Sequence, residues 1–295
     1  MSQTHNRTRV VCVAACLAAL AALAFAGSAS AKLTGEFAKF AQCPYNNLEV
    51  KKCIYSPTEG GEVVLGTKKV PITSTAYLQG GFGKLNAETG FSKFYEALNG
   101  ITLSKAAQSV PGGLLGIVPP EKSPPLVKAL SAFFFENALT GVNSTLELSK
   151  PASEIRINEN HLAEEEGITL ELPVKVHLEN PFLGKSCYVG SSSSPIWFKL
   201  TAGTTADGKL KGSGGELQLF EEGSVLQLKN AVLVDNTWSA PAASGCGGIL
   251  SFLVNPIING QIGLPSAAGK NVAILKNTIN IAARAAVKLN NEEHP

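Results

Sequence analysis

A strict two-residue alternation of apolar and polar side chains runs through residues 168–178. Every even position holds Ile, Leu or Val, and every odd position holds Thr, Glu, Pro, Lys or His. Successive side chains of a β-strand point to opposite faces, so this period predicts a strand with one buried and one solvated face. Pro173 lacks the N–H that a sheet neighbour would use, which predicts an edge strand or a bulge at this point.

Further strand-like stretches set the expected fold class. They lie at residues 62–77, 145–149, 196–201, 216–220, 225–234 and 279–289, and residues 221–224 are typical of a hairpin loop. Helical patterns are few: a stripe of apolar residues spans 126–137, and a short turn is expected at 91–98. The 29 Gly and 16 Pro also argue against a helical bundle. The sequence therefore predicts a mainly-β fold, a sandwich- or barrel-like antiparallel sheet with one or two short helices.

The first 31 residues have the three parts of a secretory signal peptide. Arg7 and Arg9 form a positive region, residues 10–26 are uncharged and apolar, and small residues precede a cleavage site between Ala31 and Lys32. An uncleaved anchor is the alternative, because the apolar region is slightly long. The whole formal charge of +2 lies at the two arginines, so the exported chain is formally neutral. A neutral chain has no long-range attraction to nucleic acid, and no later stretch is apolar enough for a membrane span.

Four of the six cysteines remain after this cut, namely Cys43, Cys53, Cys187 and Cys246. An even number in an exported chain predicts two disulfides, and three pairings are possible. We favour Cys43–Cys53 with Cys187–Cys246, because the first pair brackets a polar, turn-prone segment. Closing these two loops stabilises the fold by about 3 and about 4 kcal/mol in the loop-entropy model. The spacing of the cysteines does not suit zinc.

Few residues could carry acid–base or metal chemistry. The exported chain has three histidines, His161, His177 and His294, and two aspartates, Asp207 and Asp235. G-x-S-x-G, phosphate-loop, dinucleotide-binding and EF-hand patterns are absent from the sequence. We therefore predict no catalytic residue, no metal ligand and no cofactor.

Three features of the sequence allow a functional interpretation as well as a purely structural one. His161 stands beside residues 164–166, which are three glutamates, but without a second histidine this pattern favours an exposed acidic loop. His177 falls on the polar face of the alternating strand, where a solvated or cross-strand role is usual. A sugar-stacking platform could be built from aromatic residues, but core packing is their favoured role: Tyr188, Trp197, Phe198 and Trp238.

The Gly- and Pro-rich stretch 112–125 is the best internal boundary. The expected organisation is a signal peptide at 1–31, an N-terminal extension or part of the β domain at 32–120, and the main β domain at 121–295.

Three segments carry a resemblance, namely residues 139–148, residues 172–191 with Cys187 inside, and residues 255–269. They are similar to segments of a group of exported actinobacterial proteins of uncharacterised function. The resemblance covers the C-terminal half well and the N-terminal half loosely. It implies secretion from a high-GC Gram-positive bacterium, and it transfers neither an activity nor a functional residue.

These features predict a compartment and a class rather than an activity. We expect a secreted protein, extracellular or associated with the cell envelope, that is stabilised by disulfides and acts as a non-enzymatic binding or structural module. A glycan or another envelope component is the expected kind of partner, and nucleic acid is not. A secreted hydrolase using Glu carboxylates is the alternative, since 21 glutamates allow many pairs. A chain that inserts strands into a membrane is a weaker third class, because most alternating runs are short.

Overall fold

The computed structural model describes residues 32–113, 122–125, 128 and 141–294. The predicted signal peptide and the predicted helical stripe at 126–137 lie outside these residues, apart from Lys128. The strands are β1 (Lys52–Leu65), β2 (Lys68–Pro71), β3 (Ala76–Leu85), β4 (Ser92–Tyr95), β5 (Ala107–Val110), β6 (Val142–Leu148), β7 (Arg156–Ile157), β8 (Leu170–Glu179), β9 (Tyr188–Val189), β10 (Ile196–Leu200), β11 (Glu216–Phe220), β12 (Val225–Asp235), β13 (Ala243–Ser244) and β14 (Val272–Ala283). The helices are α3 (Glu159–Glu164), α4 (Ser251–Ile262) and α5 (Arg284–Glu293), with short 3₁₀ turns η1 (Gly35–Phe40), η3 (Ala152–Glu154), η4 (Glu221–Gly223) and η5 (Gly248–Leu250).

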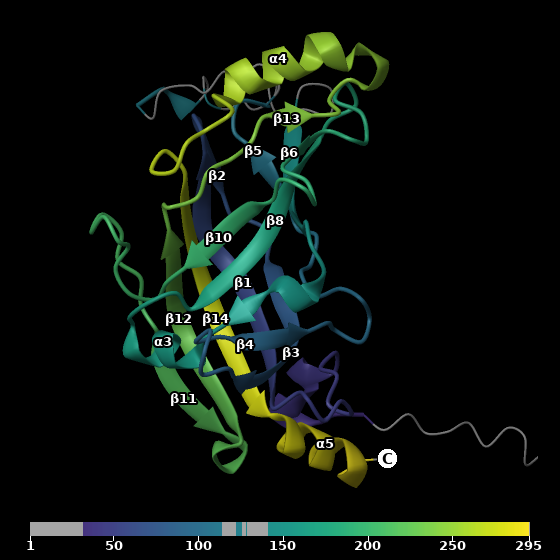
Figure 1. Cartoon of the computed structure of the whole chain (residues 1–295), viewed down its shortest axis with the longest axis vertical. Helices are drawn as coiled ribbons and strands as arrows, with labels where there is room; N and C mark the ends of the chain where they lie inside the picture. Colours follow the sequence, from purple (N-terminus) through teal and green to yellow (C-terminus); the bar gives the residue numbers. More distant parts are fainter. Residues whose placement is uncertain (1–31, 114–121, 126–127, 129–140, 295) are drawn as a thin grey trace, which may run out of the picture.

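The strands form one antiparallel sheet that folds over on itself, so the predicted mainly-β, sandwich-like class is confirmed (Figure 1). Its order is β11-β12-β14-β1-β3-β4-β7-β8-β6-β5, with β2 beside β1, β9 and β10 beside β8, and β13 beside β9. In Figure 1 the long strands β12, β14, β1 and β3 run along the molecule, and β8 and β10 cross in front of them. Thr201, just after β10, exchanges two backbone hydrogen bonds with Val234 on β12 (3.0 and 2.9 Å), which joins the two layers.

The alternating stretch is strand β8, as predicted, and its even positions are buried. The predicted edge or bulge at Pro173 is wrong, because β8 has neighbours on both sides. On one side β7 pairs with residues 170–171 and β6 with residues 174–179, so Pro173 lies at the junction between these two strands. Its carbonyl oxygen accepts from the N–H of Ser149, 3.1 Å away. A proline is tolerated inside the sheet here because neither β6 nor β7 pairs with residue 173.

The hairpin of β11 and β12 is confirmed, while the structure differs from three other predictions of secondary structure. The stretch 62–77 is split by a turn between β1 and β2, and β4 is a strand where a helical turn was expected. The predicted strand at 279–289 ends at Ala283 and continues as α5. The alternation there does not hold beyond β14, because Val287 is buried while Leu289 is exposed. Ala285 and Ala286, in the first turn of α5, have high helix propensity, which favours the helix.

Both predicted disulfides are present, and each belongs to a different hydrophobic cluster. Cys187–Cys246 lies in the larger core between the layers. Cys43–Cys53 lies in a smaller cluster in which Phe37 and Phe40 of η1 pack with Val287 of α5. The expected N-terminal part, residues 32–120, and the expected main β domain, residues 121–295, contribute strands to the same sheet. For example, β1 pairs with β14 along most of its length, and β5 pairs with β6.

A break in the β1–β14 ladder gives a testable consequence. Gly61 follows the register shift in β1 and has φ +104°, and a Cβ there would lie 1.9 Å from the carbonyl oxygen of Ile274. We expect Gly61→Ala to lower the free energy of unfolding by about 2–3 kcal/mol, from backbone strain and this collision. Gly60→Ala is the control, because its Cβ would meet only the Lys276 side chain at 3.8 Å. Equal losses for the two variants in urea denaturation would contradict this account.

Candidate functional site

An apolar cavity of about 110 Å³ lies between the two layers of the sheet. Alternate residues of β8 line one side of it, namely Leu170, Leu172 and Val176. Aliphatic side chains of β1, β2, β3, β12 and β14 line the opposite side, and Phe198 and Leu200 of β10 complete the wall. The two-residue period therefore supplies the lining, because it turns every second side chain of β8 toward the facing layer.

Gln108 and Asn277, two polar residues of the lining, are hydrogen-bonded to other parts of the chain. The Gln108 Oε1 accepts from the N–H groups of Thr73 and Ser74, and its Nε2 donates to the Ser74 carbonyl at 2.7 Å. The Asn277 Oδ1 accepts from the Thr58 hydroxyl at 2.7 Å. None of the described residues that line the cavity is charged. The site is therefore suited to an apolar molecule and offers little to a charged one.

The size of the cavity limits what it can hold. An apolar cavity of roughly 150 Å³ in another protein stays dry and binds benzene. A cavity of about 110 Å³ thus has room for one small ring or the end of an acyl chain, but not for a whole lipid.

The carboxylates of both aspartates accept hydrogen bonds from neighbouring segments of the chain. The Asp235 carboxylate is buried and accepts from the backbone N–H of Lys199 at 2.6 Å and from Thr237. Asp207 accepts two hydrogen bonds from the Asn236 side chain and one from Thr205, at 2.8–2.9 Å. The bonds from Asn236 above all, together with those from Lys209 and Thr205, hold the pKa of Asp207 far below its usual value.

His161 lies on α3 and binds the protein backbone. Its Nδ1 is 2.9 Å from the carbonyl oxygen of Ile168, and its ring meets Phe91 edge-on. The neighbouring glutamates at 164–166 are exposed, as an acidic loop predicts, and Glu165 accepts from the N–H of Gly214 at 2.7 Å. Across the ranges that the structure describes, no three His, Cys, Asp or Glu side chains come together as a metal site.

The four candidate aromatic residues do not form a platform. Trp238 and Phe198 are buried against each other with ring centroids 5.0 Å apart, which confirms core packing for both. Trp197 is half-buried, opposite Pro173. Tyr188 stacks on His177 with ring centroids 4.4 Å apart, so His177 has the predicted cross-strand role.

His177 belongs to a charged cluster on the outer face of β6 and β8 that the sequence did not reveal. Glu147 of β6 is paired with Lys105 at 2.9 Å and with Lys175 at 3.4 Å. The His177 Nδ1 lies 3.1 Å from the Glu179 carboxylate and 3.9 Å from that of Glu147. Burial alone raises the pKa of Glu147, but the hydrogen bonds and charges of the two lysines outweigh it and lower the pKa below the usual value.

The lowered pKa of Glu147 predicts a loss of stability in acid. A carboxylate with a depressed folded-state pKa stabilises the fold above its unfolded pKa, and this contribution disappears as the pH falls through the folded value. We expect the free energy of unfolding to fall as the pH drops below about 4.5, and to fall less steeply in Glu147→Gln. Urea denaturation at a series of pH values measures both slopes. Identical slopes in the two proteins would contradict this role, and Lys105→Gln should flatten the slope in part.

Comparison with known proteins adds no family to this picture. No family model, no curated protein and no solved structure matches the chain. The cavity and its lining therefore stand as the basis for a functional proposal.

Proposed function

We propose that this chain is an exported, non-enzymatic binding protein whose cavity receives a small apolar group. A ring or the end of an acyl chain, carried by a component of the cell envelope, has the chemistry that the lining suits. The apolar cavity, with no charged residue among the described residues of its lining, is the observation that carries the proposal. The resemblance to exported actinobacterial proteins and the signal-like first 31 residues support the compartment, and both remain predictions.

Two structural facts are compatible with an extracellular location. The chain has two disulfides, which persist in oxidising compartments. Among the helices of the described residues, none has the length and apolar character needed to cross a membrane.

The hydrolase alternative gains no support from the described glutamates whose contacts are given above. Glu147 is paired with two lysines, and Glu165 accepts a backbone hydrogen bond. Neither arrangement resembles a facing pair in which one carboxyl has a raised pKa.

Benzene and glycerol, which are similar in size and opposite in polarity, test the proposal. We expect benzene to raise Tm and to shift the methyl NMR signals of the lining residues, because a ligand that binds only the folded state stabilises it. Glycerol at the same concentration should leave the methyl signals of the lining unchanged. Leu172→Phe and Ala76→Leu fill the cavity and should abolish the benzene response. Leu217→Phe, on the exposed face of β11, is the control and should keep it.

Three results would overturn the proposal. They are no response to benzene in the wild-type protein, an equal response in the cavity-filling variants, or methyl shifts that map outside the lining. Two filling variants at different strands are used because added bulk in a packed core is itself destabilising.

A further inference from the structure

One end of the molecule carries a group of exposed apolar side chains on and around α4. The α4 patch consists of Phe182, Ile249, Leu250, Phe252, Leu253 and Ile257. Ile249 is 96% exposed, and each of the other side chains is more than half exposed. The loop that bears Phe182 lies beside the chain that leads into α4, because the carbonyl of Leu183 accepts a hydrogen bond from the N–H of Gly247 at 2.7 Å. Such an accumulation of large exposed apolar groups marks an interaction site.

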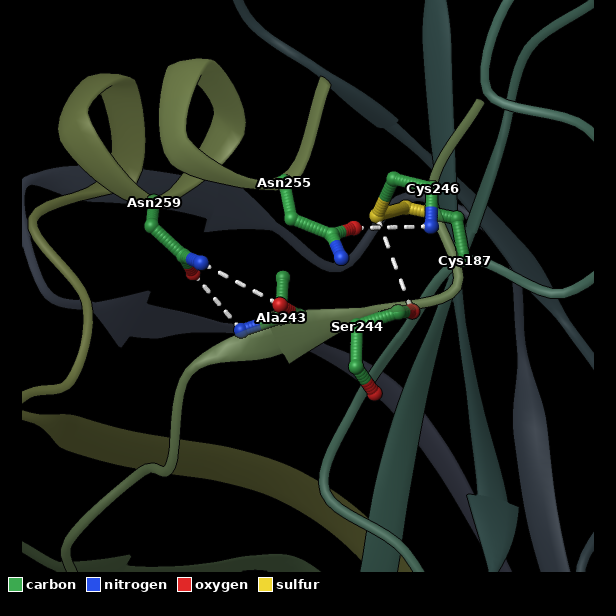
Figure 2. Close-up of a disulfide and its surroundings, with 6 residues drawn as sticks. All are labelled: Cys187, Ala243, Ser244, Cys246, Asn255 and Asn259. Atoms are coloured by element: carbon green, nitrogen blue, oxygen red, sulfur yellow. Dashed lines mark hydrogen bonds between the residues drawn. A yellow bond between two sulfur atoms is a disulfide. The ribbon is translucent and has the colours of Figure 1, made fainter. Parts of the chain in front are cut away.

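The inner side of α4 is firmly attached, so the exposure of its outer side is set by the fold. Figure 2 shows Asn255 and Asn259, four residues apart, pointing from one side of the helix toward β13 and the disulfide. The Asn255 Oδ1 accepts from the N–H of Cys246 at 2.9 Å. The Asn259 side chain accepts from the N–H of Ala243 at 2.6 Å and donates to its carbonyl at 3.1 Å. Ile258 and Ile262 are buried in the larger core on the same side of the helix.

The distribution of charge identifies the occupant of the patch. The sequence has no charged residue from Asn236 to Gly269, although it is charged on both sides of this stretch. Lys185 follows the loop of Phe182 near the start of α4, and Lys68 follows Thr67, whose N–H binds the carbonyl of Ile262 at the helix end. Charged groups are costly inside a lipid layer, whereas cations beside it are attracted to anionic headgroups. Exposed apolar side chains with lysines beside them therefore combine the two features that favour contact with such a layer.

We propose that the α4 patch docks this protein on an anionic lipid surface. The helix lies along the surface, with its apolar side chains about 5–10 Å below the headgroups and the lysines at headgroup level. In Figure 1, α4 lies across one end of the sheet and α5 with the C-terminus at the other, so the docked molecule stands on α4. This inference uses a different surface from the cavity and does not depend on the proposed ligand.

Vesicle co-sedimentation of the secreted protein tests the proposal, once N-terminal sequencing has verified removal of the signal peptide. The vesicles are phosphatidylcholine mixed with phosphatidylglycerol, and phosphatidylcholine alone. The test variant is Leu250→Glu with Leu253→Glu, at side chains 55% and 54% exposed. The matched control is Leu217→Glu with Leu219→Glu on β11, at 58% and 60% exposed. Both variants add two negative charges at exposed leucines, so folding is retained, as circular dichroism checks.

We expect the wild-type protein and the β11 variant to bind the mixed vesicles equally. The α4 variant should bind at least about ten-fold more weakly, and phosphatidylcholine alone should bind the wild-type protein less. No vesicle binding by the wild-type protein would overturn the proposal, as would equal loss in both variants. Light scattering that shows a dimer, broken by the α4 variant and without vesicle binding, would assign the patch to a second copy of the chain instead.

Discussion

Replacing both Cys187 and Cys246 by alanine lowers the free energy of unfolding by about 4 kcal/mol, because the disulfide closes a loop 59 residues long in the unfolded chain. The substitutions also remove two fully buried sulfur atoms from the larger core, to which both cysteines belong. Cys246 also follows β13 closely and donates its N–H to Asn255, so the bond fixes the base of α4 (Figure 2). Urea denaturation measures the loss, and hydrogen exchange should be faster in α4 of the variant.

The double alanine variant of Cys43 and Cys53 is the control for this prediction. Its loop spans 10 residues, so the same model gives a smaller loss of about 3 kcal/mol. The exchange rates of α4 should stay unchanged, because this disulfide lies in the other cluster. A larger loss for the short loop than for the long one would contradict the explanation by loop entropy.

Phe198→Ala is the second change with a large expected effect, a loss of about 4 kcal/mol. The ring is 1% exposed, faces the cavity and meets the Trp238 ring edge-on. Removing it leaves Trp238 without its aromatic neighbour and enlarges a void that already exists, so transfer and cavity terms add. The variant should also accept larger apolar ligands than benzene, provided that it stays folded.

Phe252→Ala provides the matched control, since this phenylalanine is largely exposed on α4. The same atoms are removed there without creating a cavity, so the free energy of unfolding should change by less than about 0.5 kcal/mol. Similar losses at both sites in urea denaturation would mean that Phe252 is covered in solution. Phe198→Leu should fall between the two, because it leaves a smaller void.

The sequence predicted the strands best where side chains alternate over many residues. The period in β8 correctly placed Leu170, Leu172 and Val176 on the buried face. It could not show that a cavity remains beside them, because that depends on how closely the opposite layer approaches. The role of Pro173 was misjudged for a similar reason, since only the three-dimensional pairing reveals a junction between two neighbouring strands.

The least visible element in the sequence was α4. Asn255, Pro256 and Asn259 interrupt its apolar run, and this interruption concealed a surface helix. A signal was nevertheless present: Asn255 and Asn259 are four apart, as are Ile258 and Ile262, and this spacing places them on one side of a helix. Similarly, the charged cluster around Glu147 joins residues from β6, β8 and the chain before β5, which no local pattern connects.

The pairing of β1 with β14 has a consequence for when this protein can fold. The first long strand of the chain has the last strand as its partner, and the N–H of Lys32 binds the carbonyl of His294. Contacts between such distant parts of a chain form slowly, because a very long loop must close first. The central ladder therefore cannot assemble until the chain has been synthesised as far as Ala283. Until then β1 lacks the strand that pairs with it along most of its length, and its unpaired edge is open to other strands.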